Sequence, residues 1–154
     1  MIIKKTKNIL LGVGNCLRSD DGAGSFIAQH FHHHHWITID GGSAPENVTS
    51  VIKKIKPSLL IIVDASQMNL NAGSFRIIPL EKIISLQLST HSLPLHLLME
   101  YLTPYCQKLI LIGIQPLSTQ IGENLSEPVL KGCYFLIDLF KKNRIEEIEK
   151  LSLE

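Results

Sequence analysis

The sequence is poor in the features that mark secreted, membrane-spanning and zinc-ribbon proteins. It has three cysteines in 154 residues, Cys16, Cys106 and Cys133, and no two of them form a C-x-x-C pair. This usage predicts neither a disulfide framework nor a zinc ribbon, and it favours a reducing, cytoplasmic setting. No apolar run approaches the roughly 18 residues that a membrane span needs. The first residues also lack the long apolar stretch of a signal peptide.

An excess of charge of one sign is lacking as well. The 15 basic and 14 acidic residues give a formal net charge of +1, so we expect neither nucleic acid nor an anionic membrane as a partner. Apolar residues, at 45 %, are by contrast sufficient to cover both faces of a sheet. The length suits one folded unit. We therefore predict a single domain over residues 1–154, expected to be a monomer.

Apolar segments and the residues between them predict strands that alternate with helices. We expect strands over 7–14, 36–40, 59–64, 74–78 and 109–114, and helices over 23–31, 46–55, 93–102 and 128–142. This alternation indicates an α/β fold, a three-layer α/β/α sandwich of the phosphorylase/hydrolase-like kind. Only about ten residues separate the third and fourth strands, too few for a helical crossover. We therefore predict a mixed, mainly parallel five-stranded sheet with an antiparallel fourth strand. The tail over 143–154 is expected either to extend the last helix or to fray, and the fraying would affect residues 146–154.

Three acidic or imidazole groups lie close to the ends of predicted strands or the start of a predicted helix. Asp21 belongs to the glycine-flanked turn GNCLRSDDG after the first strand, Asp64 ends the third strand, and His91 precedes the helix expected from residue 93. Ligands of open α/β sheets bind beyond the carboxyl ends of the strands, where the strand order reverses. We therefore expect the three side chains to share one site. Two carboxylates and an imidazole suit a divalent ion such as nickel or zinc.

Each of these residues alone has a simpler interpretation. An aspartate before a helix is more often an N-cap than a ligand, and we assign that role to Asp20 rather than Asp21. Asp64 could cap the next turn, and His91 could be a structural histidine. Only their convergence on one edge favours a site. Cys16 has no histidine near it in sequence to activate it, so we interpret it as a loop residue.

The segment HFHHHH, which contains His30 and His32 to His35, is the most conspicuous cluster in the sequence. Such a tract can bind nickel or zinc, which leaves a nickel-binding chaperone or storage module as an alternative function. We favour a solvated turn at the opposite end of the sheet from the acidic residues. The sequence has no G-x-S-x-G elbow, H-E-x-x-H helix or Walker lysine. A different hydrolase on the same fold, such as an aminopeptidase or nucleoside phosphorylase relative, is a third interpretation.

Five motifs, GNCLRSDDGAG, DGGSAPEN, LLIIVDAS, STHSLPL and LIGIQP, occur in this order from about residue 8 to about residue 116. Together they resemble the hydrogenase maturation proteases, with the greatest likeness to the branch that serves formate-hydrogenlyase-type hydrogenases. These endopeptidases remove the C-terminal extension of the large subunit of nickel–iron hydrogenases after nickel insertion. The segment after Pro116 matches no pattern that would identify the precursor.

The resemblance implies that Asp21, Asp64 and His91 are the catalytic and nickel-facing residues. It also implies that the nickel arrives with the substrate, the large-subunit precursor, and that the isolated enzyme holds no permanent metal. The supporting residues would be Asn15, Asp40, Gly41 and Gly42.

Overall fold

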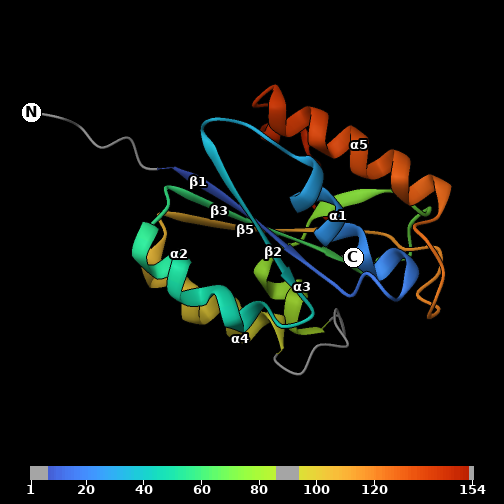
Figure 1. Cartoon of the computed structure of the whole chain (residues 1–154), viewed down its shortest axis with the longest axis horizontal. Coiled ribbons are helices and arrows are strands. Elements are labelled where there is room, and N and C mark those ends of the chain that lie inside the picture. Colours follow the sequence, from blue (N-terminus) through green and yellow to red (C-terminus); the bar gives the residue numbers. More distant parts are fainter. Residues whose placement is uncertain (1–6, 86–93, 153–154) are drawn as a thin grey trace, which may run out of the picture.

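The computed structural model describes residues 7–85 and 94–152, and a five-stranded sheet with helices on both faces dominates them (Figure 1). The strands are β1 (Asn8–Val13), β2 (Trp36–Gly42), β3 (Leu59–Ala65), β4 (Phe75–Ile77) and β5 (Lys108–Ile114). The α-helices are α1 (Ala23–His30), α2 (Thr49–Ile55), α3 (Leu80–Ser85), α4 (Leu95–Leu102) and α5 (Glu127–Lys141). Short 3-10 helices are η1 (Ser19–Gly22), η2 (Pro45–Val48), η3 (Thr103–Tyr105) and η4 (Ile145–Glu147).

The sheet has the strand order β2-β1-β3-β5-β4. All neighbouring strands are parallel except β4, which pairs antiparallel with the end of β5. The predicted mixed sheet is therefore confirmed, including its antiparallel fourth strand. From β1 the chain continues to β2, which pairs with one edge of β1. It then crosses to β3, which pairs with the other edge of β1. The strand order consequently reverses between β1 and β3, which is where an open α/β sheet binds ligands.

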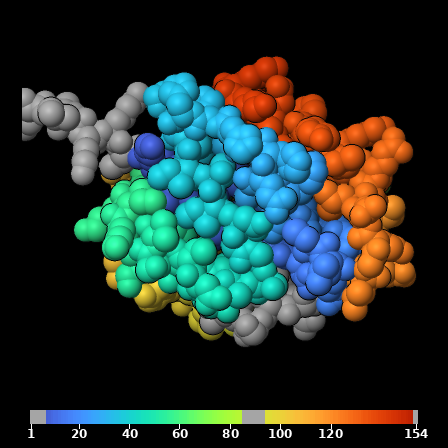
Figure 2. All heavy atoms as spheres, in the orientation of Figure 1, coloured from blue at the N-terminus to red at the C-terminus, as the bar shows by residue number. Residues whose placement is uncertain are grey.

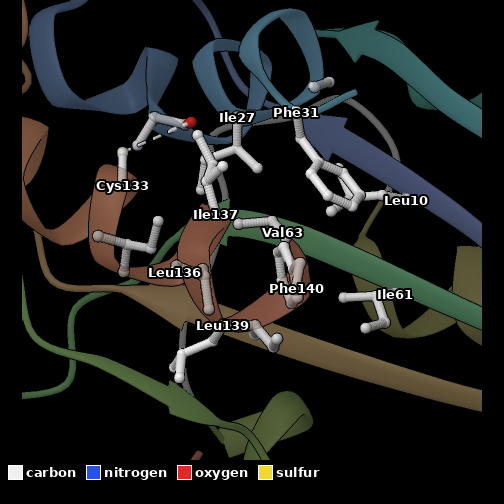
Figure 3. Packing of buried hydrophobic residues seen from close by; sticks show 14 of the residues in the cluster. Leu10, Ile27, Phe31, Ile61, Val63, Cys133, Leu136, Ile137, Leu139 and Phe140 are labelled. Atoms are coloured by element: carbon white, nitrogen blue, oxygen red, sulfur yellow. Dashed lines mark hydrogen bonds between the residues drawn. The ribbon is translucent and has the colours of Figure 1, made fainter. Parts of the chain in front are cut away.

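Alternating strand residues pack into two separate cores, one on each face of the sheet. Leu10, Ile61 and Val63 lie in the core that α1 and α5 cover (Figure 3). Leu60 and Ile62 belong to the core on the other face, with residues of α2, α3 and α4. Helices on both faces of one sheet form the predicted sandwich. None of the helices in the described part of the chain has the length and apolar character that a bilayer span requires.

The first turn of α1 lies directly on β1 and β3 because residue 24 is glycine. A β-carbon on Gly24 would lie 2.2 Å from the carbonyl oxygen of Val63 and 2.4 Å from that of Val13. Both distances are far inside van der Waals contact, so no larger residue fits without moving the helix. This close approach places the segment that precedes α1 at the carboxyl ends of the two central strands.

The tail departs from the expectation that it extends α5 or frays. Asn143 adopts a left-handed φ of 54°, and α5 ends just before it at Lys141. The chain then folds back, and the backbone N–H of Leu151 donates to the carbonyl of Ile77 in β4 at 2.8 Å. Ile148 is buried in the core under α5. Up to residue 152 the tail therefore covers the outer edge of β4, because an uncovered edge strand and an exposed isoleucine would both be unfavourable.

Two further differences concern short helices. The segment 80–85 forms α3, which no helical period in the sequence predicts, and the helix expected over 46–55 begins as the 3-10 turn η2. Six residues are too few to display a helical period. Pro45 at the start of η2 removes a backbone donor, which an initial turn tolerates.

Candidate functional site

Asp21 lies in η1, immediately after the turn that leaves β1. The turn folds back at Gly14, whose φ of 146° favours glycine, and a β-carbon there would lie 1.8 Å from the carbonyl oxygen of Asp21. The side chain of Asp21 is 9 % exposed, and its Oδ2 accepts a hydrogen bond from the backbone N–H of Asn15 at 3.1 Å. The turn therefore positions this carboxylate at the carboxyl end of β1.

Asp64 is fully buried near the end of β3, opposite Gly113 of β5. Because side chains alternate along a strand, Asp64 follows Leu60 and Ile62 toward the face that carries α2 and α4. The helix η1 contacts β3, so Asp21 and Asp64 lie at adjacent ends of the two central strands. This is the point at which the strand order reverses.

His91 lies outside the described residues, so the structure gives no position for it. Within residues 7–85 and 94–152, no three His, Cys, Asp or Glu side chains are arranged to hold a metal ion. The described part of the proposed ligand set is thus the pair Asp21 and Asp64. Two carboxylates alone do not complete the coordination shell of a divalent cation, so positions would remain for ligands from another molecule.

The residues assigned a supporting role shape the turns around this edge. The Asn15 side chain accepts a hydrogen bond from the backbone N–H of Leu17 at 3.0 Å, and the carbonyl of Gly42 accepts one from the N–H of Gly14 at 2.8 Å. Asp40 is exposed on the edge strand β2. Its carboxylate accepts hydrogen bonds from the Gln29 side chain at 2.8 Å and from the backbone N–H of Gly42 at 3.0 Å. The described contacts of Asp40 therefore join β2 to α1.

The expectation that Asp20 caps the following helix is wrong, because its carboxylate binds the loop after β5. It is fully buried and accepts hydrogen bonds from the backbone N–H groups of Leu117, Ser118 and Ser126 and from the Ser126 hydroxyl. Neither η1 nor α1 has a side-chain cap. The four bonds, at 2.7 to 3.1 Å, fasten the turn after β1 to the loop after β5.

Gln115 is another buried polar residue beside this edge, and the sequence around it does not predict its contacts. Its Oε1 accepts hydrogen bonds from the backbone N–H groups of Met68 at 2.7 Å and Leu70 at 3.3 Å. Its Nε2 donates to the Gln67 side chain at 2.8 Å. The amide therefore holds the loop that follows Asp64. The Gln-Pro pair at the end of β5 was the available signal, but its partners lie 45 to 48 residues away.

The cysteines are free thiols in three different environments. Burial raises the pKa of the Cys133 thiol from 9.0 to about 12, with a smaller contribution from the negative charge of Asp20. Burial also raises the pKa of Cys106. Cys133 and Cys106 are therefore unsuited to act as thiolate nucleophiles at neutral pH. Cys16 is exposed on the turn after β1.

The histidine tract lies at the other end of the sheet from the acidic pair. The backbone carbonyl of His35 accepts a hydrogen bond from the backbone N–H of Asn8, the first residue of β1. The rings of His33, His34 and His35 lie 4.0 to 5.5 Å apart and line a hollow of about 600 Å³. Lys7 and Lys141 line the same hollow, and their charges disfavour a bound cation. The position at the opposite end of the sheet is confirmed.

Known proteins resemble this chain over most of its length. A family model described as hydrogenase maturation protease matches residues 25–142, which contain Asp64 but not Asp21. Hydrogenase 3 maturation protease from Escherichia coli K12 is 42 % identical over 113 residues, covering 71 % of this chain and 72 % of that protein. The solution structure of the endopeptidase HycI from E. coli aligns with a TM-score of 0.87 at 33 % identity, covering 96 % of this chain and 98 % of that one. The crystal structure of the nickel–iron hydrogenase maturation protease HycI from Thermococcus kodakarensis KOD1 aligns with a TM-score of 0.80 at 29 % identity, covering 92 % and 94 %.

Proposed function

This chain belongs to the hydrogenase maturation protease family and is a peptide-bond hydrolase, and we propose that it recognises nickel already bound in its substrate. In this proposal the substrate is the precursor of a nickel–iron hydrogenase large subunit, and the enzyme removes its C-terminal extension. Asp21, Asp64 and His91 complete the coordination of the precursor's nickel ion. The free thiols of the chain suit a reducing compartment, so we place the reaction in the cytoplasm.

One observation carries the proposal: two buried carboxyl groups lie at adjacent ends of β1 and β3, where the strand order reverses. Oxygen donors from two carboxyl groups suit a divalent ion, so an ion delivered by the substrate would be attracted to this edge when the complex forms. The same carboxylates would give a nickel-free precursor no comparable attraction.

The nickel ion then has two roles that general chemistry supports. It fixes the scissile peptide near the acidic pair, and it can polarise the scissile carbonyl or a water molecule. Hydrolysis adds the elements of water across the peptide bond, leaving a carboxylate on the mature subunit and an amine on the released extension. Cleavage therefore becomes a check on nickel loading.

The test is a processing assay with nickel-loaded precursor, in which gel mobility reports loss of the extension. Asp21→Asn, Asp64→Asn and His91→Ala should each slow cleavage by about 100-fold or more, because each removes one anionic or imidazole ligand. Asp21→Glu keeps the charge and should retain more activity than Asp21→Asn. The matched control is Asp138→Asn, which alters an exposed carboxylate bonded only to Lys142 among the described contacts. Normal processing by all three site variants would overturn the assignment.

A further inference from the structure

Three large apolar side chains are exposed on the two loops beside Asp21. Leu17, in the turn after β1, is 73 % exposed, and Leu117 and Ile121, in the loop after β5, are 67 % and 80 % exposed. We call these three residues the apolar rim. Figure 2 shows the turn after β1 in blue against the orange loop after β5 on one face of the molecule.

The backbone beneath the apolar rim is tied together by hydrogen bonds. The N–H of Gly122 donates to the carbonyl of Leu17 at 2.8 Å, and the Ser19 hydroxyl donates to the carbonyl of Asn124 at 2.8 Å. Arg18 Nε donates to the carbonyl of Thr119 at 3.3 Å. Together with the four bonds to Asp20, these contacts make one framework of the two loops. The exposed side chains are therefore displayed on a framework that is itself fixed.

We propose that the apolar rim binds an apolar segment of the hydrogenase precursor while the acidic pair engages its nickel. This inference rests on the proposed function. The apolar rim is continuous with that site, and this continuity identifies the occupant. The Asp20 carboxylate accepts a hydrogen bond from the backbone N–H of Leu117 at 2.9 Å, and the next residue after Asp20 is Asp21. Burying exposed leucine and isoleucine side chains in the complex contributes affinity that does not depend on nickel.

Two other occupants fit the rim less well. A second copy of this chain would need an interface of about 1,200 Å² or more for stable association, and three side chains supply a small part of that. A membrane surface would require basic residues around the apolar ones, whereas the two loops carry one basic residue, Arg18, against the acidic Asp20, Asp21 and Glu123. Both alternatives are outcomes of the experiment below.

The experiment measures binding and cleavage separately in the full chain. A triple variant carries Leu17→Ser, Leu117→Ser and Ile121→Ser, and Ile121→Ser alone is a milder second variant. The control combines Val51→Ser and Phe135→Ser, which remove exposed apolar side chains from α2 and α5. Biolayer interferometry measures affinity for the nickel-free precursor, and the gel assay gives kcat and KM with nickel-loaded precursor. Circular dichroism checks that each variant is folded.

The apolar rim should control affinity rather than the chemical step. The triple variant should bind nickel-free precursor at least about tenfold more weakly and raise KM by a similar factor, with kcat within about twofold of wild type. Ile121→Ser should show a smaller effect in the same direction, and the control should match wild type.

Unchanged affinity and KM in both folded rim variants would overturn the inference. A wild-type dimer that the triple variant converts to monomer, or rim-dependent binding to phosphatidylglycerol vesicles in place of precursor, would also overturn it. Normal cleavage by the Asp21 and Asp64 variants would instead remove the proposed function and leave the rim's effect on affinity measurable.

Discussion

Asp20 and Asp21 are adjacent residues of the same type that the fold uses differently. The Asp20 carboxylate accepts hydrogen bonds from three backbone N–H groups and one hydroxyl of the loop after β5. The Asp21 carboxylate accepts one hydrogen bond from its own turn. An anion that accepts four hydrogen bonds is well stabilised in a buried position. Asp20 is therefore a structural anchor, and the proposed ligand role belongs to its neighbour Asp21.

Replacing Asp20 by asparagine should destabilise the protein strongly. Asparagine keeps one acceptor oxygen but presents an NH₂ group to backbone donors that need an acceptor, so we expect a loss of about 3 kcal/mol in the free energy of unfolding. Urea denaturation at neutral pH measures this loss. The matched control Asp138→Asn, on the exposed face of α5, should change it by less than about 0.5 kcal/mol. A similar small change for Asp20→Asn would contradict the anchor role.

The sequence draws attention to the neighbours Asp20 and Asp21 but predicts the wrong role for Asp20. Its local pattern suggested a helix cap for Asp20, because N-caps are defined by neighbours within a few residues. The actual partners of Asp20 are 97 to 106 residues away. No periodicity or motif encodes such a contact. The contacts of Gln115 cannot be predicted from the sequence for the same reason, because its partners are 45 to 48 residues away.

Helix α1 connects the site to the sheet through backbone contact. Gly12 faces the carbonyl of Gly24, and Gly24 faces the carbonyls of Val13 and Val63. The helix therefore lies closer to β1 and β3 than any side chain would permit. Because η1 leads directly into α1, the distance between α1 and the sheet also determines where Asp21 lies relative to Asp64.

Gly24→Ala should impair both stability and cleavage. The added methyl would meet two carbonyl oxygens within 2.4 Å, which forces α1 away from the sheet. We expect a loss of about 3 kcal/mol in stability and at least about a tenfold lower kcat. Gly122→Ala is the control, because its β-carbon would meet nothing within 4 Å although its φ is 87°; it should cost about 1 kcal/mol. Denaturation midpoints and the gel assay compare the two, and equal effects would contradict close packing as the cause.

Among the elements, the five strands and the four longer helices were predicted well, whereas the short helix α3 and the course of the tail were not. The strands expected over 36–40 and 109–114 extend by one or two residues, to Trp36–Gly42 and Lys108–Ile114. The antiparallel β4 followed from the length of its connection alone. The helix α3 is too short to show a helical period. The tail could not be predicted because a distant strand fixes it, through the hydrogen bond from the N–H of Leu151 to the carbonyl of Ile77. Contacts between distant residues are the part that local patterns omit.

The whole molecule has two chemically different ends. The carboxyl ends of β1 and β3 carry the buried acidic pair and the apolar rim, whereas the amino end carries the histidine-lined hollow with its lysines. The sequence predicted this separation, because residues after a strand and residues before the next one lie at opposite ends of a parallel sheet. The apolar rim could not be predicted, since an exposed leucine in a loop looks like a buried one until the fold is known.

Recognition of the substrate's nickel by Asp21 and Asp64 is tested by comparing two preparations of one precursor. Wild-type enzyme is mixed with nickel-loaded precursor and with the same precursor kept nickel-free, and the rate of loss of the extension is measured for both. The nickel-loaded form should be cleaved at least about 100-fold faster, equivalent to about 2.7 kcal/mol of selective stabilisation. Equal rates for the two forms would contradict it.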